Sequence, residues 1–170
     1  MYCSPFSAHS VLLPRQYNSG MAKINYYTSG HGFGHATRAI EVINHLPESV
    51  EVEIVTSVPE WLFKKSVYRA YRYRELFHDP GIIQQDALRQ DAGRTLERWT
   101  HLLDEYPAMA RAEARRIAEE DVCLAAGDVS PFTIAAARAA GIPSVITANF
   151  TWDWIFTAFL DSRPEFQKII

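Results

Sequence analysis

The chain has 170 residues and a formal net charge of −3, with 48% hydrophobic and 22% charged residues. This composition is typical of one globular domain with a hydrophobic core, and the slight acidity argues against a dedicated nucleic-acid-binding protein. No apolar run approaches the roughly 20 residues of a membrane span. The two cysteines, Cys3 and Cys123, form neither a disulfide framework nor a zinc motif. We therefore expect a cytoplasmic protein with no membrane span.

The first 20 residues differ in composition from the rest. They mix Ser, Pro, Tyr and Asn, and their only apolar run is Val11-Leu12-Leu13. The segment lacks the basic start and the sustained apolar core of a signal peptide. We interpret 1–20 as a disordered leader or an over-long start with Met21 as the true initiator, so that the folded domain occupies 21–170.

Strand and helix patterns alternate through the first half of the domain. Apolar runs and helical stripes predict strand, helix, strand, short helix and strand, in this order: Lys23–Thr28, Ala36–Leu46, Val50–Thr56, Pro59–Lys65 and Arg69–Phe77. In the last of these, tyrosines alternate with arginines. That pattern fits a nucleic-acid stacking surface or an edge strand with its arginines in solvent and its tyrosines against a helix, and we favour the edge strand.

The second half continues the alternation. Asp79-Pro80-Gly81 predicts a turn, followed by a polar loop over Ile82–Asp91 with room for one helical turn. Pro107 must kink or split the long helix that follows. The remaining predicted elements are the helix Gly93–Glu120, a buried strand Asp121–Ala126, the helix Phe132–Ala140 capped by Gly141, a buried strand Ile142–Ala148, a helix within Asp153–Leu160, and a tail Asp161–Ile170 with no closing element. This order predicts an α/β fold with a doubly wound, mostly parallel, Rossmann-like sheet.

Three polar loops follow predicted strands, and the carboxyl ends of parallel strands form the usual ligand-binding edge. They are the glycine-rich stretch Thr28–Arg38, Gly127–Pro131 and Asn149–Trp154. A glycine-rich loop leading into a helix N-terminus favours an anion. Its glycines are spaced G-x-G-x-G and no Gly-Lys-Ser/Thr follows, so neither a nicotinamide-cofactor fingerprint nor a P-loop is indicated. We expect a phosphorylated or sugar ligand.

His35 and Asp128 are the candidate acid–base pair. A histidine at a helix N-terminus can act as a general base if a carboxylate orients it, and Asp128 ends the strand expected beside the first. The alternative is that His35 only satisfies backbone groups and Asp128 caps the following helix. His31 and His35 have no third ligand spaced near them, so we assign no metal site.

Arg38 lies in the first helical turn, where its charge opposes the helix dipole. Its position therefore indicates an anionic partner or a structural carboxylate.

The stretch Thr28–Arg38 resembles the start of the glycosyltransferase-like N-terminal domain of plant L-arabinokinases and their bacterial relatives. These belong with the GT-B glycosyltransferases, near the peptidoglycan lipid-linked GlcNAc transferase. Further similarity lies in Asp79–Leu88 with Asp91, in Gly127–Pro131 and in Asn149–Ile155. The resemblance covers residues 23 to about 160.

The resemblance implies a GT-B N-terminal domain, which contributes the acceptor side of a nucleotide-sugar transfer site. It implies that His35 deprotonates an acceptor hydroxyl with help from Asp128. It also implies a nucleotide-sugar co-substrate, no other cofactor, and a C-terminal donor domain or partner chain that these residues lack, so that the chain is a fragment. The alternative is a non-catalytic sugar or sugar-phosphate binding module that serves a sugar kinase. The residues expected to contact substrate are Gly30, His31, Gly32, Phe33, Gly34, Thr37, Arg38, Asn149, Trp152 and Asp153.

Overall fold

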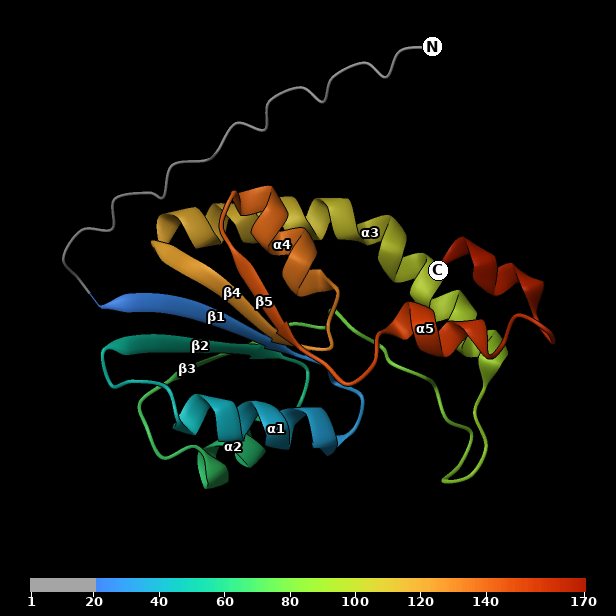
Figure 1. Cartoon of the computed structure of the whole chain (residues 1–170), viewed down its shortest axis with the longest axis horizontal. Helices are drawn as coiled ribbons and strands as arrows, with labels where there is room; N and C mark the ends of the chain where they lie inside the picture. The colour runs from blue at the N-terminus through green and yellow to red at the C-terminus, as the bar shows by residue number, and fades with distance from the viewer. Residues whose placement is uncertain (1–20) are drawn as a thin grey trace, which may run out of the picture.

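The computed structural model describes residues 21–170, so the predictions for 1–20 lie outside the described residues. Its centre is a five-stranded sheet in the order β3-β2-β1-β4-β5, and every neighbouring pair is parallel. This confirms the doubly wound parallel sheet (Figure 1). The strands are β1 (Ala22–Thr28), β2 (Val50–Thr56), β3 (Arg72–Glu75), β4 (Val122–Asp128) and β5 (Ser144–Thr147).

Helices cover both faces of this sheet. They are α1 (Phe33–Asn44), α2 (Glu60–Ser66), α3 (Ala92–Glu119), α4 (Phe132–Ala140), α5 (Trp152–Thr157) and the 3-10 helix η1 (Pro164–Lys168). In Figure 1, α1 and α2 lie on one face, and α3 and α4 lie on the other. Because successive strand residues point to opposite faces, Tyr26 belongs to the core beneath α1 and Tyr27 to the core beneath α3.

The structure corrects two expectations about the second half of the chain and decides between the alternatives of a third. α3 runs as one helix through Pro107, so the proline does not split it. Proline removes one intrahelical hydrogen bond, and the packing of α3 on α4 is extensive enough to keep the helix continuous. The polar loop 82–91 contains no helical turn and instead forms an antiparallel bridge between Gln84 and Gln90. The tail does have a closing element, because η1 buries Phe166 against Phe156.

The fifth strand was also predicted wrongly, as buried. β5 is an edge strand, and Val145 is 52% exposed. An apolar run of this length is typical of a central parallel strand, but the run itself carries no information on which position the strand takes in the sheet. β4 lies between β1 and β5, as its apolar run predicts.

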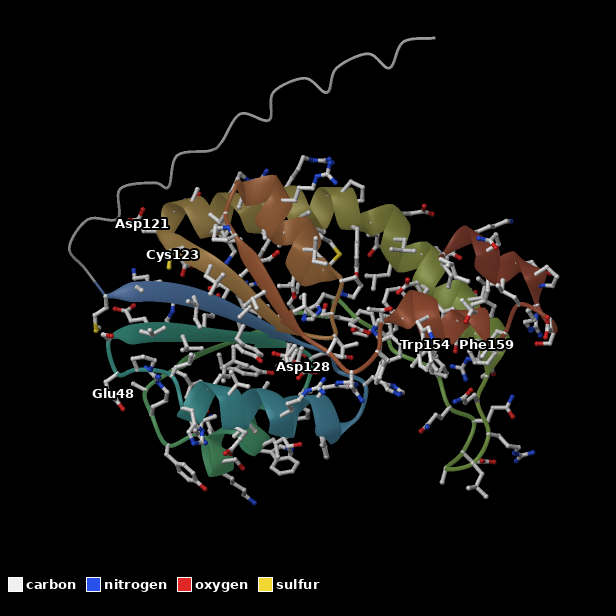
Figure 2. All side chains as sticks on the ribbon, viewed as in Figure 1. Glu48, Asp121, Cys123, Asp128, Trp154 and Phe159 are labelled. Atoms are coloured by element: carbon white, nitrogen blue, oxygen red, sulfur yellow. The ribbon has the colours of Figure 1, made fainter. Side chains whose placement is uncertain are left out.

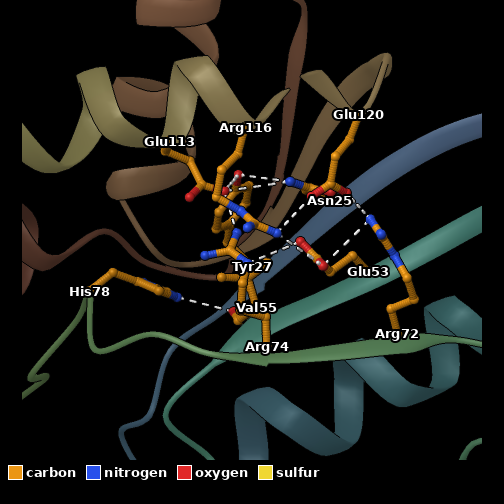
Figure 3. Close-up of polar contacts among 10 residues, drawn as sticks. All are labelled: Asn25, Tyr27, Glu53, Val55, Arg72, Arg74, His78, Glu113, Arg116 and Glu120. Atoms are coloured by element: carbon orange, nitrogen blue, oxygen red, sulfur yellow. Dashed lines mark hydrogen bonds and ion pairs between the residues drawn. The ribbon is translucent and has the colours of Figure 1, made fainter. Parts of the chain in front are cut away.

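The arginine-bearing strand is an edge strand, as favoured, but Arg74 does not face solvent. Its Nε donates to Glu53 Oε2 at 3.1 Å, and its Nη2 donates to Glu113 on α3 (Figure 3). Tyr27 Oη donates to Glu113 Oε1 at 2.7 Å. Both carboxylates are almost fully buried, so the guanidinium of Arg74 compensates charges inside the domain. Tyr73 packs beside Phe63 of α2, as expected for a tyrosine against a helix.

We predict that Glu113→Gln destabilises the domain by about 3 kcal/mol, because removing one member of a buried ion pair leaves its partner uncompensated. Urea unfolding followed by circular dichroism measures the loss. Glu119→Gln, on an exposed position of the same helix, is the matched control and should change stability by less than about 0.5 kcal/mol. Equal effects of the two substitutions would contradict the role assigned to the buried carboxylate.

Candidate functional site

The site begins in the glycine-rich loop between β1 and α1. Gly32 is the N-cap of α1 and has a φ of +72°, a conformation that glycine adopts without strain. The hydroxyl of Ser29 accepts a hydrogen bond from the His31 N–H at 3.1 Å and so shapes the turn. No side chain among the described residues caps α1, so no side chain there competes with a ligand for the first N–H groups of this helix.

His35 and Asp128 meet at this edge of the sheet. β1 and β4 are paired with Thr28 opposite Asp128, which places the carboxylate beside the first turn of α1 (Figure 2). His35 Nδ1 lies 2.8 Å from Asp128 Oδ1. The His35 side chain is 12% exposed and that of Asp128 is fully buried. Nε2 of His35 forms no hydrogen bond with residues 21–170, so one ring nitrogen is held by the carboxylate and the other is available.

Arg38 holds the same carboxylate from one turn further along α1. Its Nε donates to Asp128 Oδ2 at 2.5 Å and its Nη2 donates to Oδ1 at 2.7 Å. Burial alone would raise the pKa of Asp128, but the hydrogen bonds from Arg38 and His35 outweigh it and lower the pKa below its usual value. The partner of Arg38 in the structure is therefore a carboxylate of the protein. Asp128 does not cap α4, which has no side-chain cap.

The loop between β5 and α5 forms the other side of the site. Asn149 Oδ1 accepts from Arg38 Nη1 at 3.1 Å, and the ring of Phe150 packs edge-on to His35 with centroids 5.8 Å apart. An open pocket of about 430 Å³ lies along this loop. It is lined by Ala148, Asn149, Phe150, Thr151 and Trp154. Trp154 is 67% exposed at its rim, so the pocket offers an aromatic face and amide groups within the same loop as the partner of Arg38.

Of the other residues predicted to contact substrate, one is buried and two are exposed. Trp152 is buried and packs against both His31 and His35, so it supports the histidines from within the core. Phe33 is half exposed and contacts Trp61 rather than His35. Asp153 is exposed in the first turn of α5 and forms no hydrogen bond with the described residues.

Three further residues predicted to contact substrate have neighbours within the domain. Thr37 Oγ1 donates to the carbonyl of Gly34 at 2.9 Å. Gly30 makes room for the hydroxyl of Ser57, which a β-carbon at Gly30 would meet at 2.1 Å. Gly30 therefore lies close to the residue that follows β2.

Asp79 is a buried carboxyl group of the site that was predicted to lie in a turn and was not among the predicted site residues. It accepts hydrogen bonds from Gly81 N–H and from Trp152 Nε1, each at 2.8 Å. Burial raises its pKa to about 6, although these donors and Ser29 oppose the shift. Asp79 therefore joins the loop after β3 to the first turn of α5 through Trp152, whose indole packs against His31 and His35. Its D-P-G context is typical of a turn and does not indicate burial.

The imidazole of His31 packs on Trp152, with ring centroids 5.5 Å apart. Burial and the neighbouring His35 lower the pKa of His31, which favours its neutral form. Within residues 21–170 no group of three or more His, Cys, Asp or Glu side chains is placed to hold a metal ion. In the same part of the chain no helix combines the length and apolarity needed to cross a bilayer.

We predict that Gly81→Ala displaces His31 and destabilises the fold. Gly81 has a φ of +59°, and a β-carbon there would lie 2.2 Å from Cγ of His31. The backbone conformation alone costs about 1–2 kcal/mol in a residue with a β-carbon. Thermal unfolding and the His31 imidazole resonances report the two effects. Gly34→Ala is the control, because nothing lies within 4 Å of its β-carbon position and α1 should gain up to about 1 kcal/mol.

The raised pKa of Asp79 predicts a pH dependence of stability. Because the folded-state pKa of about 6 exceeds the ordinary aspartate pKa of 3.8, the protonated carboxyl group stabilises the fold. This contribution is complete below the unfolded-state value and is lost as the pH rises through about 6. Between about pH 4 and pH 7, the free energy of unfolding should fall by about 2–3 kcal/mol more in the wild type than in Asp79→Asn. Parallel urea titrations would contradict this if both proteins showed the same slope.

The sequence of this chain is similar to part of one curated protein. No protein-family profile matches the chain. L-arabinokinase from Arabidopsis thaliana is 35% identical over 142 residues, which cover 79% of this chain and 13% of the relative. The chain therefore spans a small part of that protein.

Several solved structures with similar folds are glycosyltransferases. MurG of Acinetobacter baumannii matches with a TM-score of 0.51 at 17% identity, over 75% of this chain and 35% of that one. The calicheamicin glycosyltransferase CalG4 matches with a TM-score of 0.51 at 13% identity, over 85% and 37%. Phytolacca americana UGT2, solved with UDP-2fluoro-glucose and pterostilbene, matches with a TM-score of 0.50 at 17% identity, over 91% and 36%. The chain therefore has the Rossmann-like fold of the GT-B glycosyltransferases and is similar in sequence to part of plant L-arabinokinase.

Proposed function

We propose that this chain supplies the acceptor side of a nucleotide-sugar glycosyl transfer site, with His35 as the general base. The observation that carries the proposal is the contact between His35 Nδ1 and Asp128 Oδ1 at 2.8 Å. It leaves Nε2 without a partner among residues 21–170, on a ring that is partly exposed. A base held in this way by a carboxylate can accept a proton from a substrate hydroxyl.

The proposed reaction transfers a glycosyl group to an acceptor hydroxyl. Nε2 of His35 takes the hydroxyl proton while the acceptor oxygen attacks the anomeric carbon of the donor. The bond from that carbon to the phosphate oxygen breaks, and the nucleoside diphosphate leaves with the bonding electrons. Asp128 stabilises the imidazolium that forms, and Arg38 keeps the carboxylate ionised and correctly oriented.

We place the acceptor in the pocket along residues 148–154. Two residues that line this pocket contact the pair of basic side chains. The ring of Phe150 packs on His35, and Asn149 accepts a hydrogen bond from Arg38. Amide groups beside an exposed indole suit a sugar ring, which presents hydroxyls at its edge and an apolar face. The relative is named for L-arabinose, so this pentose is the first acceptor to test.

The donor is proposed to be a nucleotide sugar. One neighbour in fold was solved with UDP-2fluoro-glucose, and its chain is about three times as long as the part that matches here. We propose that a second Rossmann-like domain, in a longer polypeptide or a partner chain, binds the nucleotide opposite the glycine-rich loop. The N-terminus of α1, which has no side-chain cap, would then face the phosphates.

We expect His35→Ala to lower glycosyl transfer at least about 100-fold in kcat, with a smaller change in KM, because it removes the proton acceptor. The assay uses the full chain, with any partner that completes the site, UDP-sugars as donors and L-arabinose among the acceptors. His45→Ala is the control, since His45 is exposed at the other end of α1.

Two outcomes would overturn the catalytic assignment. One is unchanged turnover in His35→Ala. The other is sugar binding without transfer from any nucleotide sugar, with His35→Ala lowering only the affinity, which would indicate a non-catalytic binding module. Isothermal titration of the wild type and His35→Ala with L-arabinose separates these two results.

A further inference from the structure

The residue that follows Asp128 has an unusual backbone. Val129 has a φ of +63°, a region that β-branched residues rarely adopt. The N–H of Ser130 donates to the carbonyl of Asp128 at 2.8 Å, so residues 128–130 form a three-residue turn with a positive central φ. Turns of this kind are rare and strained. They persist only where the surrounding structure holds them.

Ser130, the last residue of this turn, belongs to a buried chain of hydrogen bonds. Ser130 Oγ lies 2.8 Å from His78 Nδ1, and His78 Nε2 lies 3.2 Å from the carbonyl oxygen of Val55 (Figure 3 shows the second contact). A carbonyl oxygen can only accept, so Nε2 carries the proton and Nδ1 accepts from the Ser130 hydroxyl. Ser130 and His78 are both almost fully buried. The turn after β4 is thereby fastened to the backbone of β2, across the sheet.

Ser130 lies one residue before Pro131, the N-cap of α4. Its carbonyl accepts from the Thr133 N–H at 3.3 Å, whereas its hydroxyl makes no cap hydrogen bond to α4. The side chain is directed to His78, and the ring of His78 is in turn stacked on Phe132 with centroids 5.6 Å apart.

We propose that Ser130 and His78 are positioning residues, whose hydrogen bond holds the strained turn at Val129 and thereby fixes the Asp128 carboxylate against His35. Neither residue reaches the pocket or the free nitrogen of His35. The catalytic consequence rests on the proposed function, whereas the effect on the orientation of His35 depends only on the contacts described above.

The test is the tautomer and orientation of the His35 ring in Ser130→Ala, measured on the full chain by nitrogen-15 NMR of the imidazoles. In the wild type, Nδ1 should carry the proton that is shared with Asp128. Ser130→Ala should raise the population of His35 rings without this bond roughly fivefold, the change expected when one net hydrogen bond is lost.

Tyr106→Phe is the matched control. The Tyr106 hydroxyl donates to the backbone carbonyl of His78 at 2.7 Å, so this variant removes a buried hydrogen bond from the same residue without touching Ser130. It should lower stability about as much as Ser130→Ala and leave His35 unchanged. A second pair of variants distinguishes the contribution of His78 Nδ1 from that of His78 Nε2. His78→Asn keeps an acceptor near the place of Nδ1 and should disturb His35 less than His78→Gln, which keeps a donor near the place of Nε2.

Each result decides the proposal. An unchanged His35 in Ser130→Ala overturns it, and so does an equal disturbance in Tyr106→Phe, which would indicate general loosening of the core. If the wild-type ring does not carry its proton on Nδ1, both the proposal and the proposed function fail. If glycosyl transfer is never observed but Ser130→Ala alone disturbs His35, the positioning role stands and the proposed function fails.

Discussion

The carboxylate of Asp128 is the group on which the arrangement of the site depends. It lies fully buried at the end of a central strand, where an isolated charge would be very costly. Arg38 and His35 compensate it with three hydrogen bonds. Both donors come from the first turns of α1, so the stability of this charge also fixes how α1 sits on the sheet. Loss of the carboxylate would leave the guanidinium and the imidazole without their shared partner.

The other buried carboxyl groups of the domain have two different kinds of partner. Glu53 and Glu113 share the guanidinium of Arg74 between the sheet and α3. Asp79 accepts hydrogen bonds from neutral donors instead, and burial outweighs them and raises its pKa to about 6. Arginine is thus placed where ionisation must persist, at Asp128 and at the α3 network, whereas Asp79 can change its protonation state near neutral pH.

Local sequence patterns predicted the parallel sheet and the adjacency of its first and fourth strands, because alternating strands and helices with short connections permit few topologies. The proximity of His35 and Asp128 followed from the adjacency of the first and fourth strands. Patterns failed where burial depends on distant partners. Arg74 looks solvent-facing until Glu113 of α3 is placed beside it, and Asp79 looks like a turn residue until α5 brings the Trp152 indole to it. The edge position of β5 and the burial of Phe166 are likewise set by tertiary packing.

The strained turn at Val129 explains why the network around Asp128 extends so far into the core. A carboxylate that must orient an imidazole needs a fixed backbone, since a small displacement weakens a catalytic hydrogen bond considerably. β4 fixes Asp128 from one side by pairing with β1 and β5. Beyond Asp128 the chain must turn sharply into α4, and an unsupported turn would relax toward ordinary φ values. The bond from Ser130 to His78 connects that turn to β2, so four strands of the sheet determine the position of one carboxylate.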